Sequence, residues 1–191
     1  MKVLVAANNY QSGQKDGVIG WFLLADSAVI NTGKPFYLPE GYGVVTVSLG
    51  VALKISRLGK GILKKFANRY YSEFAPVLHF SLPDYERQLI EMGLPGDAAR
   101  SFDKSLIVGE GKDKENFKEP ELWKNGEKIF SYSFSDLSLS PDEIIAEVSL
   151  LNTLKMGDLI VAGVSPAIKI EEGDFLEVKS GEERVFHVRV K

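Results

Sequence analysis

The sequence predicts an α+β fold in which a curled or sandwich-like sheet carries a few peripheral helices. Apolar and polar residues alternate from Val45 to Ile55, Asn125-Gly126 is typical of a two-residue hairpin, and strand-like segments outnumber helical ones. Because the helices are not interleaved one per strand, a parallel α/β architecture is not favoured. No linker divides the 191 residues, so we expect one domain over residues 1–191.

The first half of the chain mixes strand and helix signals. Short apolar runs predict strands at Lys2–Ala7 and Trp21–Leu24, and the residues after Ala7 are of the kind that break a strand. The alternation at 45–55 predicts a long strand with one apolar face and one small, polar face. Between 62 and 74 apolar residues recur every four positions, which predicts an amphipathic helix.

We next expect a strand at Leu78–Ser81 and then a helix at Asp84–Met92. The helix is predicted from its acidic first residue and from Gly93, which would end it. Asn125-Gly126 then joins two predicted hairpin strands. Ser140, followed by Pro141 and by Glu143, is typical of a helix cap and predicts a helix that runs to about Leu151. The remaining predicted strands are Leu122–Lys124, Glu127–Phe130, Leu159–Val164, Phe175–Val178 and Arg184–Val190.

Composition excludes several classes of function. The chain has no cysteine, which removes disulfides, thiolate metal sites and Cys nucleophiles. Its 23 Lys and Arg against 26 Asp and Glu leave a net charge of −3, so we expect no nucleic-acid partner. No signal peptide and no apolar run of bilayer length is apparent, so we expect a cytoplasmic protein without a membrane partner. One basic run is interpreted as solvated surface: Lys54, Arg57, Lys60, Lys64, Lys65 and Arg69.

Motifs with known chemistry are missing. His79 and His187 are the only histidines, and two distant histidines cannot form a zinc site. Gly59-Lys60-Gly61 and Gly109-Glu110-Gly111 do not complete a phosphate-binding loop, and no GxSxG nucleophile elbow occurs. The residues considered one by one therefore identify no reaction.

Taken in order, short motifs along the whole chain resemble the fumarylacetoacetate hydrolase family. The resemblance implies that family's mixed β-sandwich roll and a homodimer. The motifs that carry it are Asn9-Tyr10, Phe22–Ala28, Leu53–Lys60, Lys65–Tyr71, Arg100–Asp103, Lys124–Glu127 and Thr153–Ile160.

The resemblance also implies that a metal site has been lost. Active members of the family bind Mg²⁺ or Mn²⁺ through an E-x-E on one strand and an Asp on the next. These positions fall on Ser48-Leu49-Gly50 and on His79, so none of the three carboxylates is present. Residues two apart on a strand share a face, and Ser48 and Gly50 lie on the small, polar face of the predicted long strand. We therefore expect no metal cofactor.

Other site positions also depart from the family pattern. The family's H-x-x-E loop falls on Gly13–Asp16, which keeps only the acid Asp16. Arg100 keeps the positive charge of a pocket lysine, and Asp84 keeps an acid next to a lost arginine. The candidate catalytic residues are His79, Arg100, Asp16 and Asp84. The expected pocket-lining residues are Asn9, Tyr10, Leu24, Arg100, Val164 and Ser165.

Three functions remain open. The first is a non-catalytic module that binds a small carboxylate through Arg100, because the site would carry about one positive charge; Arg100 could instead pair with Asp103 or Asp84 as part of the structure. The second is a metal-independent hydrolase, lyase or isomerase of oxo acids such as acylpyruvates. In it His79 is the general acid and base, Arg100 is the carboxylate clamp, and Asp16 or Asp84 orients them. The third is a subunit that pairs with an active paralogue through apolar residues near Phe36–Leu38 or Tyr70-Tyr71.

Overall fold

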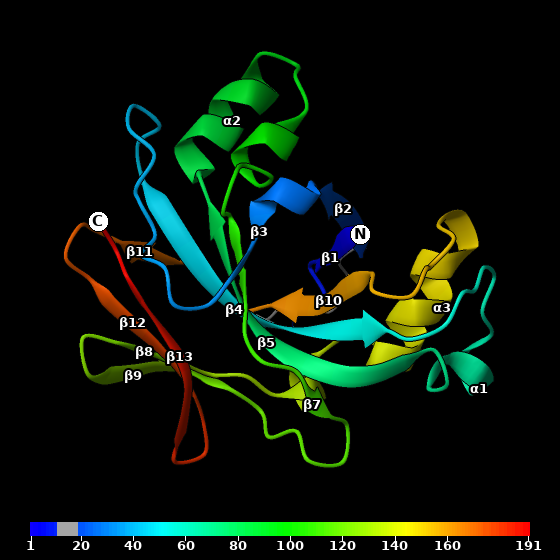
Figure 1. The fold of residues 1–191 in the computed structure, drawn as a ribbon. Helices are drawn as coiled ribbons and strands as arrows, with labels where there is room; N and C mark the ends of the chain where they lie inside the picture. The colour runs from blue at the N-terminus through cyan, green and yellow to red at the C-terminus, as the bar shows by residue number, and fades with distance from the viewer. Residues whose placement is uncertain (11–18) are drawn as a thin grey trace.

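Two β-sheets and three α-helices make up the computed structural model, which describes residues 1–10 and 19–191 (Figure 1). The larger sheet has the strand order β2-β1-β10-β4-β5-β6-β3, and β11 and β7 pair with β4 and β5. Its strands are β1 (Val3–Ala7), β2 (Gly20–Leu24), β3 (Val29–Asn31), β4 (Val45–Ile55), β5 (Tyr71–Ser81), β6 (Leu106–Val108), β7 (Lys112–Asp113), β10 (Leu159–Val164) and β11 (Ile168–Ile170).

The smaller sheet has the order β13-β12-β8-β9. Its strands are β8 (Glu121–Lys124), β9 (Glu127–Ser131), β12 (Phe175–Ser180) and β13 (Glu183–Arg189). The helices are α1 (Lys64–Ala67), α2 (Pro83–Glu91) and α3 (Pro141–Leu151). In Figure 1 α2 stands at one end of the larger sheet, while α1 and α3 lie at the other. This arrangement confirms the predicted α+β class and the roll of mixed strands with peripheral helices.

The central strand β4 separates two apolar clusters. Its odd-numbered residues, from Val45 to Ile55, belong to the main core together with residues of the smaller sheet and α3. Ala52, on the even-numbered face, packs with Val5 and Val77 in a second cluster inside the curl of the larger sheet. Because side chains alternate along a strand, Ser48 and Gly50 share this inner face with Ala52. The alternation in the sequence correctly predicted both faces of β4.

The predicted helix over residues 62–74 is wrong. Only Lys64–Ala67 is helical, and Tyr71 already begins β5. The spacing of four is misleading because Phe66 is 39 % exposed while Phe74 is buried in a strand. β5 pairs with β4 along nearly its whole length, from Ser81 opposite Thr46 to Tyr71 opposite Ile55. This long-range pairing overrides the local helical pattern.

Local signals elsewhere were read correctly. Asn125 and Gly126 both have positive φ, 53° and 88°, as a type I′ hairpin between β8 and β9 requires. Ser140 caps α3 with a capping box in which the Glu143 carboxylate accepts the Ser140 N–H at 2.8 Å. The other predicted strands correspond to β1, β2, β5, β10, β12 and β13, with Lys2 and Val190 just outside β1 and β13, and the predicted helix at 84–92 is α2.

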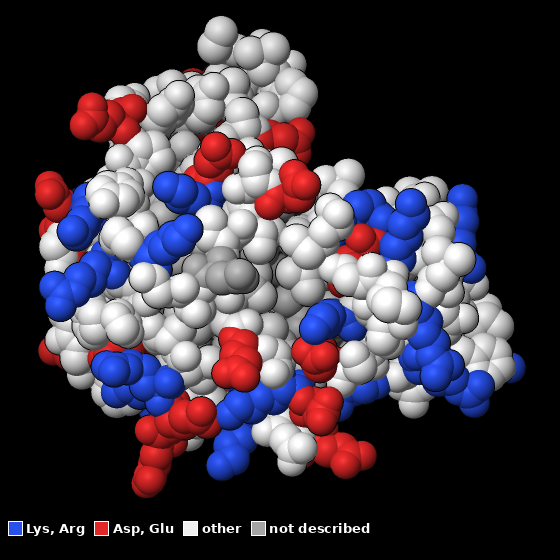
Figure 2. Space-filling model, in the orientation of Figure 1, with Lys and Arg blue, Asp and Glu red and all other residues white. Residues whose placement is uncertain are grey.

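Charge is unevenly distributed over the surface. Lys and Arg gather around α1 and α3, at the right-hand end in Figure 2, and in a second group on the left of the same view. Every member of the basic run from Lys54 to Arg69 is exposed, as predicted. Over the described ranges, no helix is both long and apolar enough to cross a bilayer.

Candidate functional site

The inner face of β4 and β5 brings two of the predicted positions together. Ser48 on β4 lies directly opposite His79 on β5, and both are buried. Gly50 lies opposite Val77, one pair further along the same face. A Cβ atom at Gly50 would come within 2.8 Å of the Gly163 carbonyl oxygen, so this position has no room for a side chain.

His79 is held in one tautomer. Its Nε2 lies 3.0 Å from the carbonyl oxygen of Arg100, and a carbonyl can only accept, so Nε2 carries the proton. The unprotonated lone pair is then on Nδ1. Burial, only partly offset by the hydrogen bond to Arg100, lowers the pKa of His79 from 6.5 to about 4. The imidazole is therefore neutral at physiological pH.

Arg100 follows a short 3₁₀ turn, Gly96–Ala99, that is tied to the larger sheet. The Leu82 N–H donates to the Ala99 carbonyl at 3.0 Å, and the Ala25 N–H donates to the Ser101 hydroxyl at 2.9 Å. The guanidinium carbon of Arg100 lies 5.0 Å from the centre of the Phe22 ring, a cation–π contact. Its Nη2 forms an ion pair with Glu86 of α2.

Phe22 completes this arrangement, because its ring centre also lies 5.6 Å from that of His79. We call Phe22, Ser48, His79, Glu86 and Arg100 the inner-face cluster. It brings a neutral imidazole close to a guanidinium, with an aromatic ring in contact with both. A carboxylate-bearing ligand could use the guanidinium and a proton acceptor in the same place.

The residues here do not fit a Mg²⁺ or Mn²⁺ ion, which takes carboxylate and other oxygen ligands. Ser48 is a neutral hydroxyl, and the Thr46 hydroxyl is engaged at 2.9 Å with that of Ser81. Within residues 1–10 and 19–191, no three His, Asp or Glu side chains lie close enough together to hold a metal ion. The closed space at Gly50 leaves no further ligand position there.

Asp84 does not contact His79 or Arg100 in the described contacts. Its carboxylate accepts the Val44 N–H at 2.9 Å and pairs with Arg87 at 3.3 Å. Asp84 therefore fastens the loop before β4 to α2, which is a structural role. Asp16, the fourth candidate, lies outside the described residues.

Asn9 and Tyr10 connect the end of β1 to the segment before α3. The Asn9 side chain is completely buried and donates to the Leu139 and Ala162 carbonyls at 2.9 and 2.5 Å. The Tyr10 hydroxyl donates to Asp136 at 2.9 Å, and desolvation raises its pKa to about 12. Their described contacts are structural.

Three further predicted pocket residues pack into the sheet. Leu24 is 3 % exposed and belongs to the inner apolar cluster, against which Val164 also packs. The Ser165 hydroxyl accepts the Leu49 N–H at 2.9 Å and donates to the Pro166 carbonyl at 3.0 Å. Ser165 thereby continues the pairing with β4 between β10 and β11. Among the predicted lining residues, Arg100 alone is a member of the inner-face cluster.

The sequence did not identify Glu86 or Phe22 as site residues. Glu86 is an ordinary acidic residue in a helix with many charges, and only the position of α2 brings it to Arg100. Phe22 was part of a family motif, but its role beside Arg100 depends on the pairing of β2 with β1. Both contacts join segments that are far apart in the chain, so no local signal could have found them.

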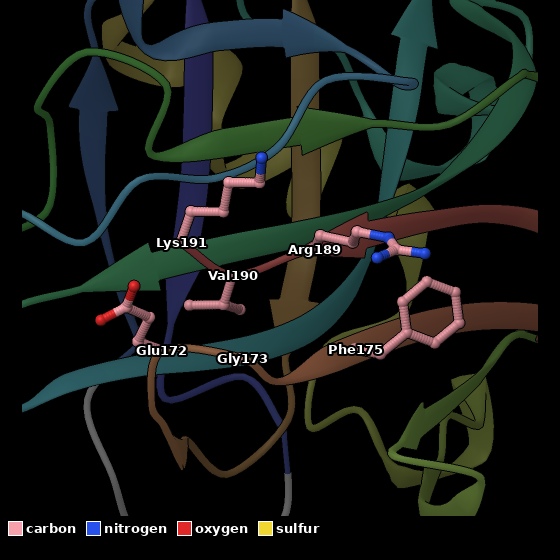
Figure 3. Close-up of a pocket in the computed structure, with 6 residues that line it drawn as sticks. All are labelled: Glu172, Gly173, Phe175, Arg189, Val190 and Lys191. Carbon is pink, nitrogen blue, oxygen red and sulfur yellow. The ribbon is translucent and has the colours of Figure 1, made fainter.

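A separate pocket of about 490 Å³ lies at the start of β12 and the end of β13. Figure 3 shows Arg189 beside the Phe175 ring, and their separation is 5.7 Å. The same view shows Lys191 pointing away from that ring. None of the predicted site residues that the structure describes lines this pocket, which is lined by Glu172, Gly173, Phe175, Arg189, Val190 and Lys191.

Comparisons with known proteins agree with the motif pattern. The family model described as "Fumarylacetoacetate (FAA) hydrolase C-terminal" matches residues 6–187. The mitochondrial oxaloacetate tautomerase FAHD1 of Mus musculus is 28% identical over 176 residues, which are 89% of this chain and 79% of the relative. The oxaloacetate tautomerase YcgM of Escherichia coli K12 is 23% identical over 164 residues, covering 82% and 75%.

Among solved structures, the crystal structure of fumarylpyruvate hydrolase from Pseudomonas aeruginosa in complex with Mn²⁺ and pyruvate superposes with a TM-score of 0.90. The match covers 100% of this chain and 89% of that chain at 20% sequence identity. At this identity the likeness shows a shared fold.

Proposed function

Because this chain belongs to the fumarylacetoacetate hydrolase family, we propose that it binds small 2-oxo acids and interconverts their keto and enol forms without a resident metal ion. The observation that carries the proposal is the contact of a neutral His79 with the Arg100 carbonyl, beside the Arg100 guanidinium. Two relatives named oxaloacetate tautomerases support the reaction class.

Each member of the inner-face cluster has a role in this proposal. The Arg100 guanidinium binds the carboxylate of the oxo acid, and the Phe22 ring keeps the guanidinium in place. His79 Nδ1 accepts a proton from the carbon next to the keto group and returns it to the keto oxygen. A C–H bond breaks and an O–H bond forms, so the reaction needs no oxidant or reductant. Burial disfavours a charged imidazole, so it makes Nδ1 a weak base for the first transfer and favours return of the proton in the second.

The second candidate function is carboxylate binding without turnover. It is favoured by the replacement of the family's carboxylate ligands that the sequence resemblance implies, and by the ion pair that already occupies one edge of Arg100. In this case Arg100 would still bind the ligand, but His79 would only support the backbone of Arg100.

An enol-absorbance assay distinguishes the two candidates. Oxaloacetate and acetylpyruvate are placed with the protein and a chelator, and the approach to keto–enol equilibrium is followed. We expect acceleration by the unmodified protein, and a loss of about a hundredfold or more in kcat for His79→Gln, because positioned acid–base groups contribute at least that much. The control is His187→Gln, since His187 is exposed on β13 of the smaller sheet.

Arg100→Gln tests the carboxylate clamp in the same assay and is expected to raise KM more than it lowers kcat. If the unmodified protein binds oxamate, an uncharged-amide analogue of oxalate, but accelerates neither substrate, the second candidate replaces the first. Absence of both binding and turnover contradicts both candidates.

A further inference from the structure

We infer that Glu86 makes the inner-face site selective for 2-oxo acids that carry one carboxylate and an uncharged tail. This inference rests on the proposed function and names the substrate class. The substrate class differs from the one in the relatives' names, because oxaloacetate carries two carboxylates.

The ion pair of Glu86 with Arg100 carries the argument. Glu86 approaches Arg100 Nη2 from α2, and the Glu86 side chain is 19% exposed, so water screens it only partly. The Arg100 side chain keeps 34% exposure, and a guanidinium has five N–H donors in a planar fork. A ligand carboxylate can therefore bind an edge of Arg100 that Glu86 leaves free.

Glu86 is held in this position by the backbone around it. Its N–H donates to the Leu82 carbonyl at 2.9 Å in the first turn of α2. A Cβ atom at Gly96 would lie 3.1 Å from Cγ of Glu86. The absence of a side chain at position 96 therefore leaves the room through which Glu86 reaches Arg100.

The charges of the cluster then set the preference. Arg100 contributes +1, Glu86 contributes −1, and Ser48 and His79 are neutral, so the sum is about zero rather than the +1 expected from Arg100 alone. A monocarboxylate brings the site to −1. A dicarboxylate brings it to −2, with its second charge opposed by Glu86.

Two pairs of ligands of matched size test this selectivity. Oxamate and oxalate differ by one charge, and so do acetylpyruvate and oxaloacetate. Binding is measured by calorimetry with chelator present. We expect the unmodified protein to bind oxamate about tenfold more tightly than oxalate, which corresponds to one like-charge contact of modest strength.

Glu86→Gln removes the charge and keeps the shape. We expect it to strengthen oxalate binding about tenfold and to change oxamate binding much less. Glu91→Gln is the matched control, because Glu91 is an exposed acid on the same helix and should leave both affinities unchanged. Glu86→Ala provides a second variant with the same expected direction, and unfolding midpoints verify that each variant is folded.

The possible outcomes distinguish a failure of the charge selectivity from a failure of the proposed function. Equal binding of oxamate and oxalate by the unmodified protein overturns the selectivity but leaves the proposed function standing. An equal gain for both ligands in Glu86→Gln also overturns it, because Glu86 would then only hold Arg100 in place. If neither the unmodified protein nor any variant binds any of the four ligands, the proposed function itself is contradicted.

Discussion

His79 and Arg100 are coupled through a backbone carbonyl, which sets the chemistry of both. The carbonyl of Arg100 can only accept, so it selects the tautomer of His79 that leaves Nδ1 unprotonated. The same contact fixes the backbone from which the Arg100 side chain extends toward Phe22 and Glu86. A change at His79 is therefore expected to affect both proton transfer and the position of the guanidinium.

Burial of neutral His79 predicts a specific loss of stability in acid. The pKa of His79 is about 4 in the folded protein and 6.5 in an ordinary environment, so the unfolded chain takes up the proton first as pH falls. Stability is lost as pH falls from about 6.5 to about 4. Between pH 7 and pH 5 we expect the free energy of unfolding to fall by about 2 kcal/mol more than in His79→Gln.

Urea unfolding at the two pH values measures this difference. His187→Gln is the control, and it should keep the full acid loss because His187 is exposed. An identical pH dependence in the unmodified protein and in His79→Gln would show that His79 is not buried in the neutral form.

Gly50 explains how β4 can pair with two strands on the same side. β10 pairs with β4 as far as Val164 opposite Gly50, with a register shift after Val161, and β11 continues the pairing opposite Val47. The Gly163 carbonyl approaches Gly50 so closely that only glycine fits. The register shift in β10 thus fits against the glycine at position 50 of β4.

Gly50→Ala should therefore destabilise the sheet. The added Cβ would lie 2.8 Å from a backbone oxygen that cannot move freely, so we expect a loss of about 2 kcal/mol in the free energy of unfolding. Gly20→Ala on β2 is the control, because no atom lies within 4 Å of its Cβ, and it should change stability by less than about 0.5 kcal/mol. Equal effects of the two variants in urea unfolding would contradict this account.

The curl of the larger sheet brings the members of the inner-face cluster together. One face of the sheet packs on α3 and the smaller sheet and forms the main core, whereas the other face carries the inner-face cluster. β2, β4, β5, α2 and the segment before β6 each contribute one residue to the cluster. Ligand binding should therefore stabilise the entire fold, because it joins elements from both halves of the larger sheet.

Thermal unfolding with added ligands tests this expectation. Oxamate at about 100 times its Kd should raise Tm by about 5–10 °C, since it binds only the folded chain. Mn²⁺ alone should leave Tm unchanged, because Glu86, the one carboxylate of the cluster, is paired with Arg100, and no three His, Asp or Glu side chains of the described residues lie close enough together to hold the ion. A saturable rise with Mn²⁺ would mean that another set of oxygen atoms holds the ion, and would contradict the metal-free proposal.

Features carried by neighbouring residues could be read from the sequence. The two faces of β4, the Asn125-Gly126 turn and the Ser140 cap all depend on spacing within a few residues, and each was predicted correctly. The order of short motifs likewise identified the family, and the resemblance predicted His79 and Arg100 as site residues. Both residues do meet in the structure.

Features that depend on distant contacts could not be read in this way. The segment after Ala67 becomes a strand because β4 is available to pair with it, although its local spacing favours a helix. Arg100 was expected either to be free or to pair with Asp84 or Asp103, yet it pairs with Glu86 because α2 lies beside the 3₁₀ turn. The net charge of the cluster and the burial of its side chains depend on segments that only folding brings together. The net charge of about zero therefore follows from the tertiary structure and not from any one segment of the sequence.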